Sequence, residues 1–164
     1  MALALDEARA SLEAGSYPIG AVLTIDDELF VKDRNRMFND GKWSSHAEHN
    51  LFEANSKVLR ETLRGREAKV TLYTTLEPCL MCLGIAVLHR VTDIIVACPD
   101  PTGGTARLDL SELGGFYQNR LPRFHDGPFR QEAYELMVNF FKQKKLLRSE
   151  EMLLSFERMR SSWA

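Results

Sequence analysis

The run 91–98 (VTDIIVAC) constrains the fold more than any other part of the chain. It is almost continuously apolar, whereas a strand with one solvated face would alternate apolar and polar residues. An uninterrupted run of this length is typical of a strand that is covered on both faces. We therefore expect a sheet with helical layers on its two sides.

The other predicted elements extend this pattern. Apolar and β-branched runs indicate strands, and apolar residues at helical spacing indicate helices. Further strands are expected at 18–25, 28–32, 70–74 and 121–125, and helices at 3–14, 45–59, 78–89, 129–144 and 149–163. A hairpin followed by strands that alternate with helices predicts an α/β fold, a three-layer α/β/α sandwich with a mixed sheet.

The remaining stretches are expected to be loops. They are the polar segment 33–45 and the segment 99–115, which is rich in glycine and proline and is expected to contain a short helical piece. With 164 residues, no internal repeat and no linker, the chain is expected to form a single domain over 1–164. The end of the chain, from about residue 146, is expected to be an added helix.

Charge and hydropathy limit the possible partners. The chain carries 21 Lys and Arg against 23 Asp and Glu, a balance that is not typical of proteins that bind polyanions. The segment 142–148 (KQKKLLR) is basic, as RNA-binding tails often are and as a solvated helix end also is. No apolar run approaches the roughly 20 residues of a membrane span, and no basic leader precedes an apolar stretch. We therefore expect a cytoplasmic protein.

Two short motifs carry residues that bind metals and move protons, HAE at 46–48 and PCLMC at 78–82. Each stands at the expected start of a helix. Cys79 and Cys82 are three residues apart, so they share a helix face and can bind the same ion. With His46 they leave the fourth position of a tetrahedral zinc site for water, whose pKa zinc lowers to about 7. The pattern predicts catalytic Zn²⁺ with ligands His46, Cys79 and Cys82.

Glu48 stands two residues beyond His46 and can act at the same site without being a ligand. We expect it to take a proton from the attacking water and to pass it to a ring nitrogen and then to the leaving ammonia. H-x-E followed by P-C-x-x-C is the signature of zinc-dependent nucleobase deaminases. Alone, Ser45 and Glu48 also fit a helix capping box, and a C-x-x-C pair also fits a redox site. The two halves together favour deamination over a zinc ion that only braces the fold.

At these residues the chain resembles the cytidine deaminase superfamily. It looks closest to the branch of tRNA adenosine deaminases, guanine deaminases and yeast-type cytosine deaminases. The resemblance covers about residues 2–100 and includes PIGAV at 18–22 and TLYTTLEPC at 71–79. It implies a five-stranded sheet, zinc as the cofactor and, commonly, a homodimer.

The resemblance also implies contacts with the substrate. Asn35, eleven positions before the first zinc ligand, matches an asparagine that bonds the substrate base in this branch. The backbones of Ala47 and Cys79 would help to position the substrate, and Asp100 stands where the branch often places a carboxylate. The residues themselves leave simpler readings open, because an Asn in a polar loop and an Asp before a proline are both common in turns.

Beyond residue 100 the resemblance to the tRNA branch is loose, because 101–107 (PTGGTAR) lacks the lysines usual there. Together with the near-neutral charge, this difference favours a small substrate over RNA. The expected function is a zinc-dependent hydrolytic deaminase acting on the exocyclic amino group of a free nucleobase or nucleoside, such as cytosine or guanine, with release of ammonia. The alternative is a tRNA-specific adenosine deaminase that forms inosine in an anticodon loop.

Overall fold

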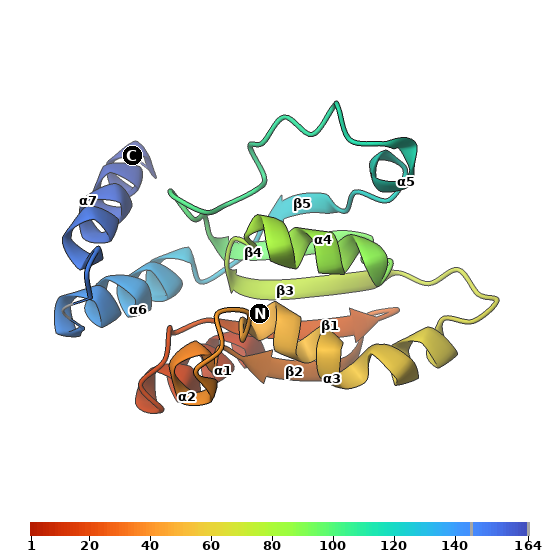
Figure 1. Cartoon of the computed structure of the whole chain (residues 1–164), viewed down its shortest axis with the longest axis horizontal. Helices are drawn as coiled ribbons and strands as arrows, with labels where there is room; N and C mark the ends of the chain where they lie inside the picture. Colours follow the sequence, from red (N-terminus) through yellow and green to blue (C-terminus); the bar gives the residue numbers. More distant parts are fainter. Residues whose placement is uncertain (145, 164) are drawn as a thin grey trace.

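A mixed five-stranded sheet forms the centre of the protein in a computed structural model, which describes residues 1–144 and 146–163 (Figure 1). In sheet order the strands are β2 (Glu28–Arg34), β1 (Gly20–Ile25), β3 (Val70–Leu76), β4 (Asp93–Cys98) and β5 (Arg123–Asp126). β1 is antiparallel to both of its neighbours, β2 and β3, whereas β3, β4 and β5 are parallel.

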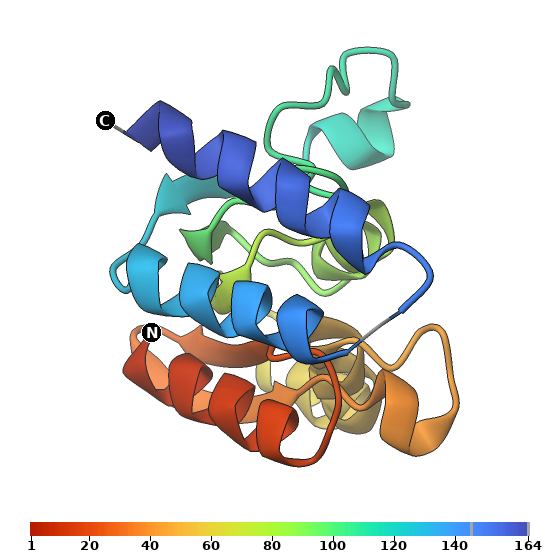
Figure 2. The same cartoon turned by 90° about the vertical axis from the view of Figure 1, so that its left-hand side faces the viewer.

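Helices cover both faces of this sheet (Figure 2). One face carries α3 (Ala47–Thr62) and α4 (Leu80–Leu88), and the other carries α1 (Ala2–Glu13) and α6 (Arg130–Gln143). The last α-helix, α7 (Ser149–Arg160), packs on α6. Two apolar clusters fill the spaces between the layers, one on each face of the sheet. The expected three-layer α/β/α sandwich is therefore confirmed.

The burial of the strands explains the apolar runs. Every residue of β1 is buried, and β4 is buried except for partly exposed Ile95. Both strands lie inside the sheet with helices on each face, so neither side of them meets water. β2 lies at the edge, and none of its residues is fully buried. Among the described residues, no helix is both long and apolar enough to cross a membrane.

A tight turn joins β2 to β1, and a glycine allows α1 to pack closely on β1. Asp26 and Asp27 both have positive φ, 51° and 67°, and form the tight turn that joins the hairpin strands. Gly20 lets the backbone of α1 lie directly on β1, because a Cβ there would stand 2.6 Å from Ala8 N and closer still to Ala4 O. A glycine is required here for space.

The prediction that 33–45 is a loop is partly wrong, because this segment contains the short helix α2 (Met37–Asp40). α2 ends at Gly41, which adopts the left-handed conformation with φ 62°. The short helical piece expected within 99–115 is instead α5 (Gly115–Gln118), which begins at the last residue of that segment. A 3-10 helix, η1 (Ser161–Trp163), follows α7. Both short α-helices are a single turn, too short to give an apolar periodicity.

Four strands, β2 to β5, end at the same edge of the sheet, because all of them run in one direction except β1. Three of them, β2, β3 and β4, are followed by predicted site residues, which gather at the carboxyl ends of these strands. Asn35 follows β2, Cys79 lies three residues beyond β3, and Asp100 lies two residues beyond β4. In open α/β sheets, ligand sites form beyond the carboxyl ends of the strands. This edge is where the predicted site residues meet.

Candidate active site

The two helices that begin at this edge each start at a predicted zinc ligand. His46 is the N-cap of α3 and has extended backbone angles, φ −77° and ψ 154°. Cys79 is the N-cap of α4, with φ −74° and ψ 172°. Pro78 precedes Cys79 and restrains the chain just before α4. Cys82 is the third residue of α4 and is buried. The predicted placement of both motifs at helix starts is confirmed.

The three side chains converge on one point. One ligand atom each from His46, Cys79 and Cys82 lies within 4.8 Å of the other two. Nδ1 of His46 lies 3.6 Å from the Sγ atoms of both cysteines. An imidazole nitrogen and two thiol sulfurs at this separation can bind one ion in tetrahedral geometry and leave the fourth position open.

The protonation of this cluster also fits a cation. Hydrogen bonding with Cys82, opposed by burial and assisted by His46, lowers the pKa of Cys79 to about 4. The same hydrogen bond with Cys79, together with burial, raises the pKa of Cys82. Hydrogen bonding with Cys79 raises the pKa of His46. Metal ligands must be deprotonated, and the lowered pKa of Cys79 favours the thiolate that a zinc ion needs.

Glu48 lies beside the cluster in the first turn of α3 and is buried. Its Oε1 is 2.9 Å from Oγ1 of Thr74 in β3, and burial raises the pKa of the carboxyl. The alternative role of Glu48 in a capping box does not fit these contacts. Ser45 is not the N-cap, and its hydroxyl contacts Asp40 Oδ2 at 2.5 Å and Asn50 Oδ1 at 3.0 Å.

Asn35 is buried at the end of β2, and its amide has a defined orientation. Its Oδ1 accepts hydrogen bonds from Ser16 Oγ at 2.8 Å and from the backbone N–H of Met37 at 3.0 Å. Because a backbone N–H can only donate, Oδ1 must be the atom that faces Met37. The amide Nδ2 is then the end of the side chain that can donate to a ligand. Ser11 Oγ, 2.7 Å from the Asn35 carbonyl oxygen, also holds this residue.

The loop after β4 is tied to the segment that carries Cys79. Glu77 accepts hydrogen bonds from the backbone N–H groups of Asp100 at 3.1 Å and Ala106 at 2.6 Å. Thr105 Oγ1 donates to the Pro78 carbonyl oxygen at 2.9 Å. Oδ1 of Asp100 accepts bonds from its own turn, including Gly103 N at 3.0 Å. This carboxylate oxygen therefore stabilises the turn, and a substrate contact of Asp100 stays a prediction.

Three polar residues of the site were not identified from the sequence. Ser16 and Thr74 are buried and contact Asn35 and Glu48, while Thr105 joins the loop after β4 to the start of α4. Serine and threonine are common everywhere, and none of these three stands within ten residues of its partner along the chain. The order of the strands brings them to the site, with β1 beside β2 and β3 for Ser16 and Thr74, and β4 beside β3 for Thr105.

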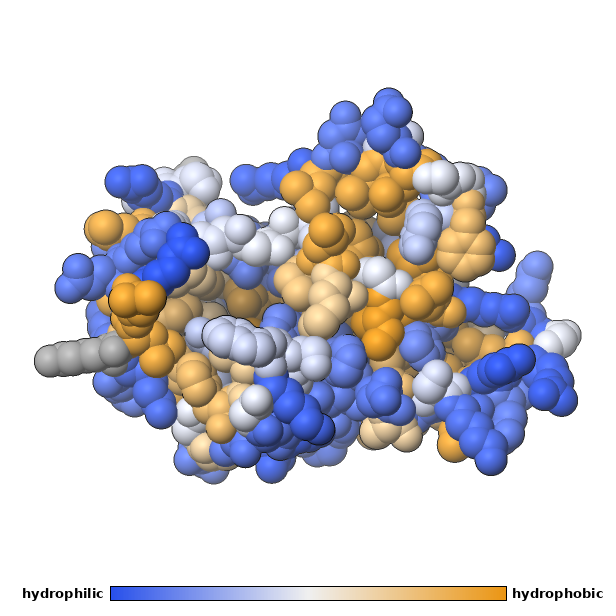
Figure 3. Space-filling view, viewed as in Figure 1, coloured by the Kyte–Doolittle hydropathy of each residue, from blue (hydrophilic) through white to orange (hydrophobic). Residues whose placement is uncertain are grey.

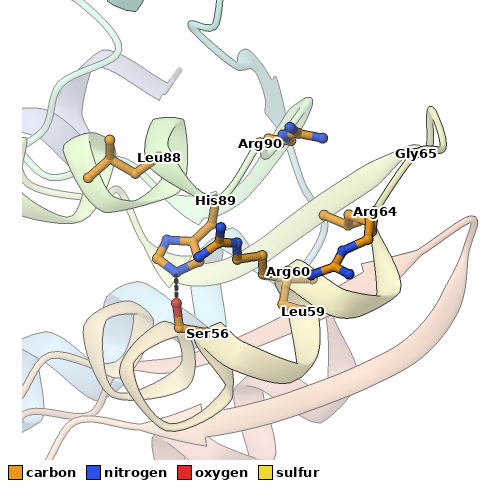
Figure 4. Close-up of a pocket in the computed structure, with 9 residues that line it drawn as sticks. Ser56, Leu59, Arg60, Arg64, Gly65, Leu88, His89 and Arg90 are labelled. Atoms are coloured by element: carbon orange, nitrogen blue, oxygen red, sulfur yellow. Dashed lines mark hydrogen bonds between the residues drawn. The ribbon is translucent and has the colours of Figure 1, made fainter.

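A separate hollow lies at the opposite ends of α3 and α4 (Figure 4). Its volume is about 520 Å³, and its lining includes Arg60, Arg64, His89 and Arg90. His89 accepts or donates a hydrogen bond of 2.8 Å with Ser56 Oγ. Since α3 rises 1.5 Å per residue, Arg60 lies roughly 20 Å from the N-terminus of α3. This hollow is therefore not part of the metal cluster.

Comparison with known proteins places the site in a family. A sequence model of the cytidine and deoxycytidylate deaminase zinc-binding region matches residues 1–98. The matched segment contains Asn35, His46, Glu48, Cys79 and Cys82 and ends with β4.

Curated relatives align along most of the chain. The tRNA-specific adenosine deaminase of Agrobacterium fabrum is 31% identical over 147 residues, which is 89% of this chain and 94% of the relative. The enzyme of the same name from Bacillus subtilis is 32% identical over 140 residues, 85% of each chain.

Solved structures share the fold. One, from a study of A-to-I editing by tRNA:A34 deaminases, superposes with a TM-score of 0.65 at 29% identity and covers 77% of this chain and 95% of that one. Guanine deaminase from Nitrosomonas europaea superposes with a TM-score of 0.66 at 20% identity, covering 85% of this chain and 81% of that one. The second likeness concerns the fold alone.

The expected substrate, a free nucleobase or nucleoside, is wrong, because the relatives that align along most of the chain are named tRNA-specific adenosine deaminases. The expectation relied on the loose match of 101–107 to the tRNA branch and on the net charge of −2. The net charge is a sum and does not say where charges gather. Nζ of Lys144 lies 5.7 Å from the Phe38 ring of α2, so the basic end of α6 lies beside the chain that leads to His46. Lys145, within the predicted basic run, lies outside the described residues.

Proposed function

The chain belongs to the zinc-dependent cytidine and deoxycytidylate deaminase family, and from this premise we propose that it converts adenosine to inosine in a tRNA anticodon loop. The observation that carries this proposal is the likeness, over most of both chains, to tRNA-specific adenosine deaminases. The reaction adds water at C6 of the purine and releases the amino group as ammonia.

We propose that His46 Nδ1 and the thiolates of Cys79 and Cys82 hold the zinc ion of this family. The convergence of these three ligand atoms within 4.8 Å supports the assignment. Zinc bound there supplies Lewis-acid chemistry that activates water as a nucleophile at neutral pH. The two helix N-termini favour the negative charge of the thiolates.

Glu48 is proposed as the catalytic acid and base. Its carboxylate takes the proton that the attacking water gives up and delivers it to N1 of the purine ring. It then takes the remaining proton from the hydroxyl group that water has left on C6 and transfers it to the amino group, so that ammonia departs as a neutral molecule and C6 becomes the carbonyl carbon of inosine. Thr74 Oγ1, 2.9 Å away, holds Oε1 in place while these protons move.

Asn35 and Ala47 are proposed to orient the base. Asn35 presents Nδ2 as a donor because Ser16 and Met37 occupy its Oδ1. Ala47 is the first residue of α3, so its backbone N–H has no partner within the helix and can donate to the substrate. Asp100 is kept as a proposed contact on the substrate side of the loop after β4.

The whole chain is proposed to act as one zinc-dependent deaminase domain in the cytoplasm, where tRNA is found. The family match ends at residue 98, but α6 packs on β3 and β4 and α7 packs on α6. Removing these helices would expose the apolar cluster on that face of the sheet.

We further propose that the protein is a homodimer formed through the outer face of α4. Leu80 and Leu88 on this face are 62% and 60% exposed, and Met81 is also exposed. Figure 3 shows apolar side chains gathered over α4 and the chain segment next to it. A contiguous apolar patch on a folded protein marks an interaction site, and sedimentation of Leu80→Arg would give a monomer if this face forms the dimer.

The test of the function is a direct comparison of substrates. Purified protein is incubated with a tRNA anticodon stem-loop that contains adenosine and, separately, with cytosine, guanine, adenine and their nucleosides. We expect inosine in the stem-loop, with a rate that falls steeply as salt is added, because RNA binding depends on phosphate contacts. Turnover of a small molecule without any turnover of the stem-loop would refute the proposal.

Zinc content tests the ligand set independently of the substrate. Cys82→Ala is expected to lose the metal and much of the stability, since metal binding stabilises the folded state. Cys98→Ala is the matched control, because Cys98 is also a buried cysteine but lies outside the cluster. Full zinc occupancy in Cys82→Ala would contradict the assignment.

A further inference from the structure

Trp43 is the most exposed large aromatic side chain among the described residues. It is 88% exposed, although tryptophan is a residue that proteins usually bury to a large extent. The other tryptophan, Trp163, packs against the Tyr134 ring at 5.4 Å and lies under the Arg130 guanidinium. A flat ligand can stack on the face of a solvent-exposed indole ring.

The backbone that carries Trp43 is held in place by hydrogen bonds on both sides. Lys42 N donates to Met37 O at 3.2 Å, and Ser45 N donates to Lys42 O at 3.1 Å. His46 N donates to Ser44 O at 2.7 Å. The indole is therefore exposed on an ordered turn, and binding a ligand there does not require the turn to order first.

This turn lies at the rim of the active site. Trp43 precedes the zinc ligand His46 by three residues, which span at most ~11 Å of chain. Lys42 is exposed next to it, and Lys144 from the end of α6 lies 5.7 Å from the Phe38 ring of the neighbouring α2. The nearby carboxylates of Asp33 and Asp40 both pair with Arg36. The rim thus combines an exposed aromatic ring with cations.

We propose that Trp43 stacks on an unpaired RNA base that neighbours the reacting adenosine. An aromatic platform beside basic side chains is how proteins hold single-stranded nucleic acid, because every base has a π face and every phosphate a charge. This inference rests on the proposed function. It adds that Trp43 binds a nucleotide next to the target adenosine. A free nucleoside has no neighbouring base and cannot make this contact.

Kinetics with the anticodon stem-loop test the role of Trp43. Trp43→Ala is expected to raise KM on the order of 10-fold to 100-fold with kcat unchanged, while Trp43→Phe keeps most of the affinity. The control is Leu29→Ala, which shortens a side chain on β2 that is 54% exposed and is expected to leave KM unchanged. The urea midpoint of Trp43→Ala is expected to equal that of the wild type, because the side chain is almost fully exposed.

Fluorescence gives a second readout that does not depend on turnover. In Trp163→Phe the only tryptophan is Trp43. Its emission is expected to be quenched by the stem-loop and not by an RNA duplex of the same stem that lacks unpaired bases. Retained turnover of Trp163→Phe shows that this variant is folded.

The outcomes separate this inference from the proposed function. If the wild type edits no stem-loop, the proposed function fails and the inference fails with it. If the wild type edits the stem-loop while Trp43→Ala keeps its KM, or while Trp43 emission is not quenched, only the inference is overturned. If Trp43→Ala changes from dimer to monomer in sedimentation, Trp43 belongs to a contact between two copies of the chain and the inference is wrong.

Discussion

Replacing Asp93 by Asn tests how the edge strand β5 is held to the sheet. Asp93 begins β4 and is buried. Its carboxylate accepts hydrogen bonds from Arg123 Nη2 at 3.0 Å and from His125 Nε2 at 2.7 Å, both in β5. Asn has nearly the same shape and lacks the charge, so the variant removes the ionic part of these contacts and keeps the packing.

The size of the effect follows from the pKa of the carboxyl. Burial raises the pKa of Asp93, but hydrogen bonds from Arg123, His125 and Thr92 outweigh burial and lower the pKa from 3.8 to about 2. At roughly 1.36 kcal/mol per pH unit, this difference amounts to at most ~2.4 kcal/mol. The Arg123 and His125 side chains are 74% and 45% exposed, and solvent screening reduces the figure to about 1–2 kcal/mol.

The pH dependence identifies the cause. A pKa that is lower in the folded state stabilises the protein above the unfolded value of 3.8, and this stabilisation is lost as the pH falls towards 2. Urea unfolding of the wild type and of Asp93→Asn is therefore expected to differ by about 1–2 kcal/mol at pH 7 and pH 5. The difference should shrink at pH 3, become small near pH 2 and disappear only below pH 2.

The control for Asp93→Asn is Glu151→Gln, which breaks an exposed ion pair with Arg148. We expect no measurable change in unfolding, because exposed pairs contribute little. A difference between wild type and Asp93→Asn that stays constant down to pH 2 would refute the reasoning. It would mean that the hydrogen-bond geometry, and not the charge, holds β5.

Three other predictions concern the site and the packing of α1. Glu48→Gln is expected to keep zinc and lose about 10²–10⁴-fold in kcat, because Gln cannot carry the proton; a variant with half the wild-type rate would contradict this role. Gly20→Ala is expected to lower the free energy of unfolding by about 1–3 kcal/mol, because its Cβ would meet the backbone of α1. Gly115→Ala, at the start of α5 with open space around it, should instead gain up to ~1 kcal/mol. Ser16→Ala removes a donor to Asn35 Oδ1 and is expected to raise KM about fivefold, whereas an unchanged KM would show that the orientation of Asn35 does not depend on it.

Much of the fold could be predicted from the sequence because the information is local. The run 91–98 has too few polar residues for a strand with a wet face, and β4 is indeed covered on both sides. Helix starts could be predicted at PCLMC from its proline and at HAE from the change from a polar loop to helical periodicity, since both signals lie within a few residues of the motif. α2 was missed because four residues, Met37–Asp40, are too few to show a period.

Part of the candidate site could be predicted from the sequence and part of it could not. The residue types of the zinc cluster and of Glu48 are specific enough to be recognised from their spacing. The substrate was predicted wrongly because net charge is a total, while recognition depends on which charges share a surface. The position of Lys144 beside α2 depends on how α6 crosses the sheet, and no local pattern encodes that crossing.

The sequence by itself determined which elements form and which side chains can bind zinc. Both follow from backbone preferences and donor chemistry that act over a few neighbouring residues. The sequence predicted that His46 shares a metal ion with Cys79 and Cys82, but only the tertiary structure places these ligand atoms within 4.8 Å of one another. Only the tertiary structure, too, decided that Ser16 orients Asn35. These contacts exist because β2, β3 and β4 run in the same direction and end at one edge. The order and direction of the strands depend on how the whole sheet packs against the helices on both of its faces. This packing brings together residues that are distant in the sequence.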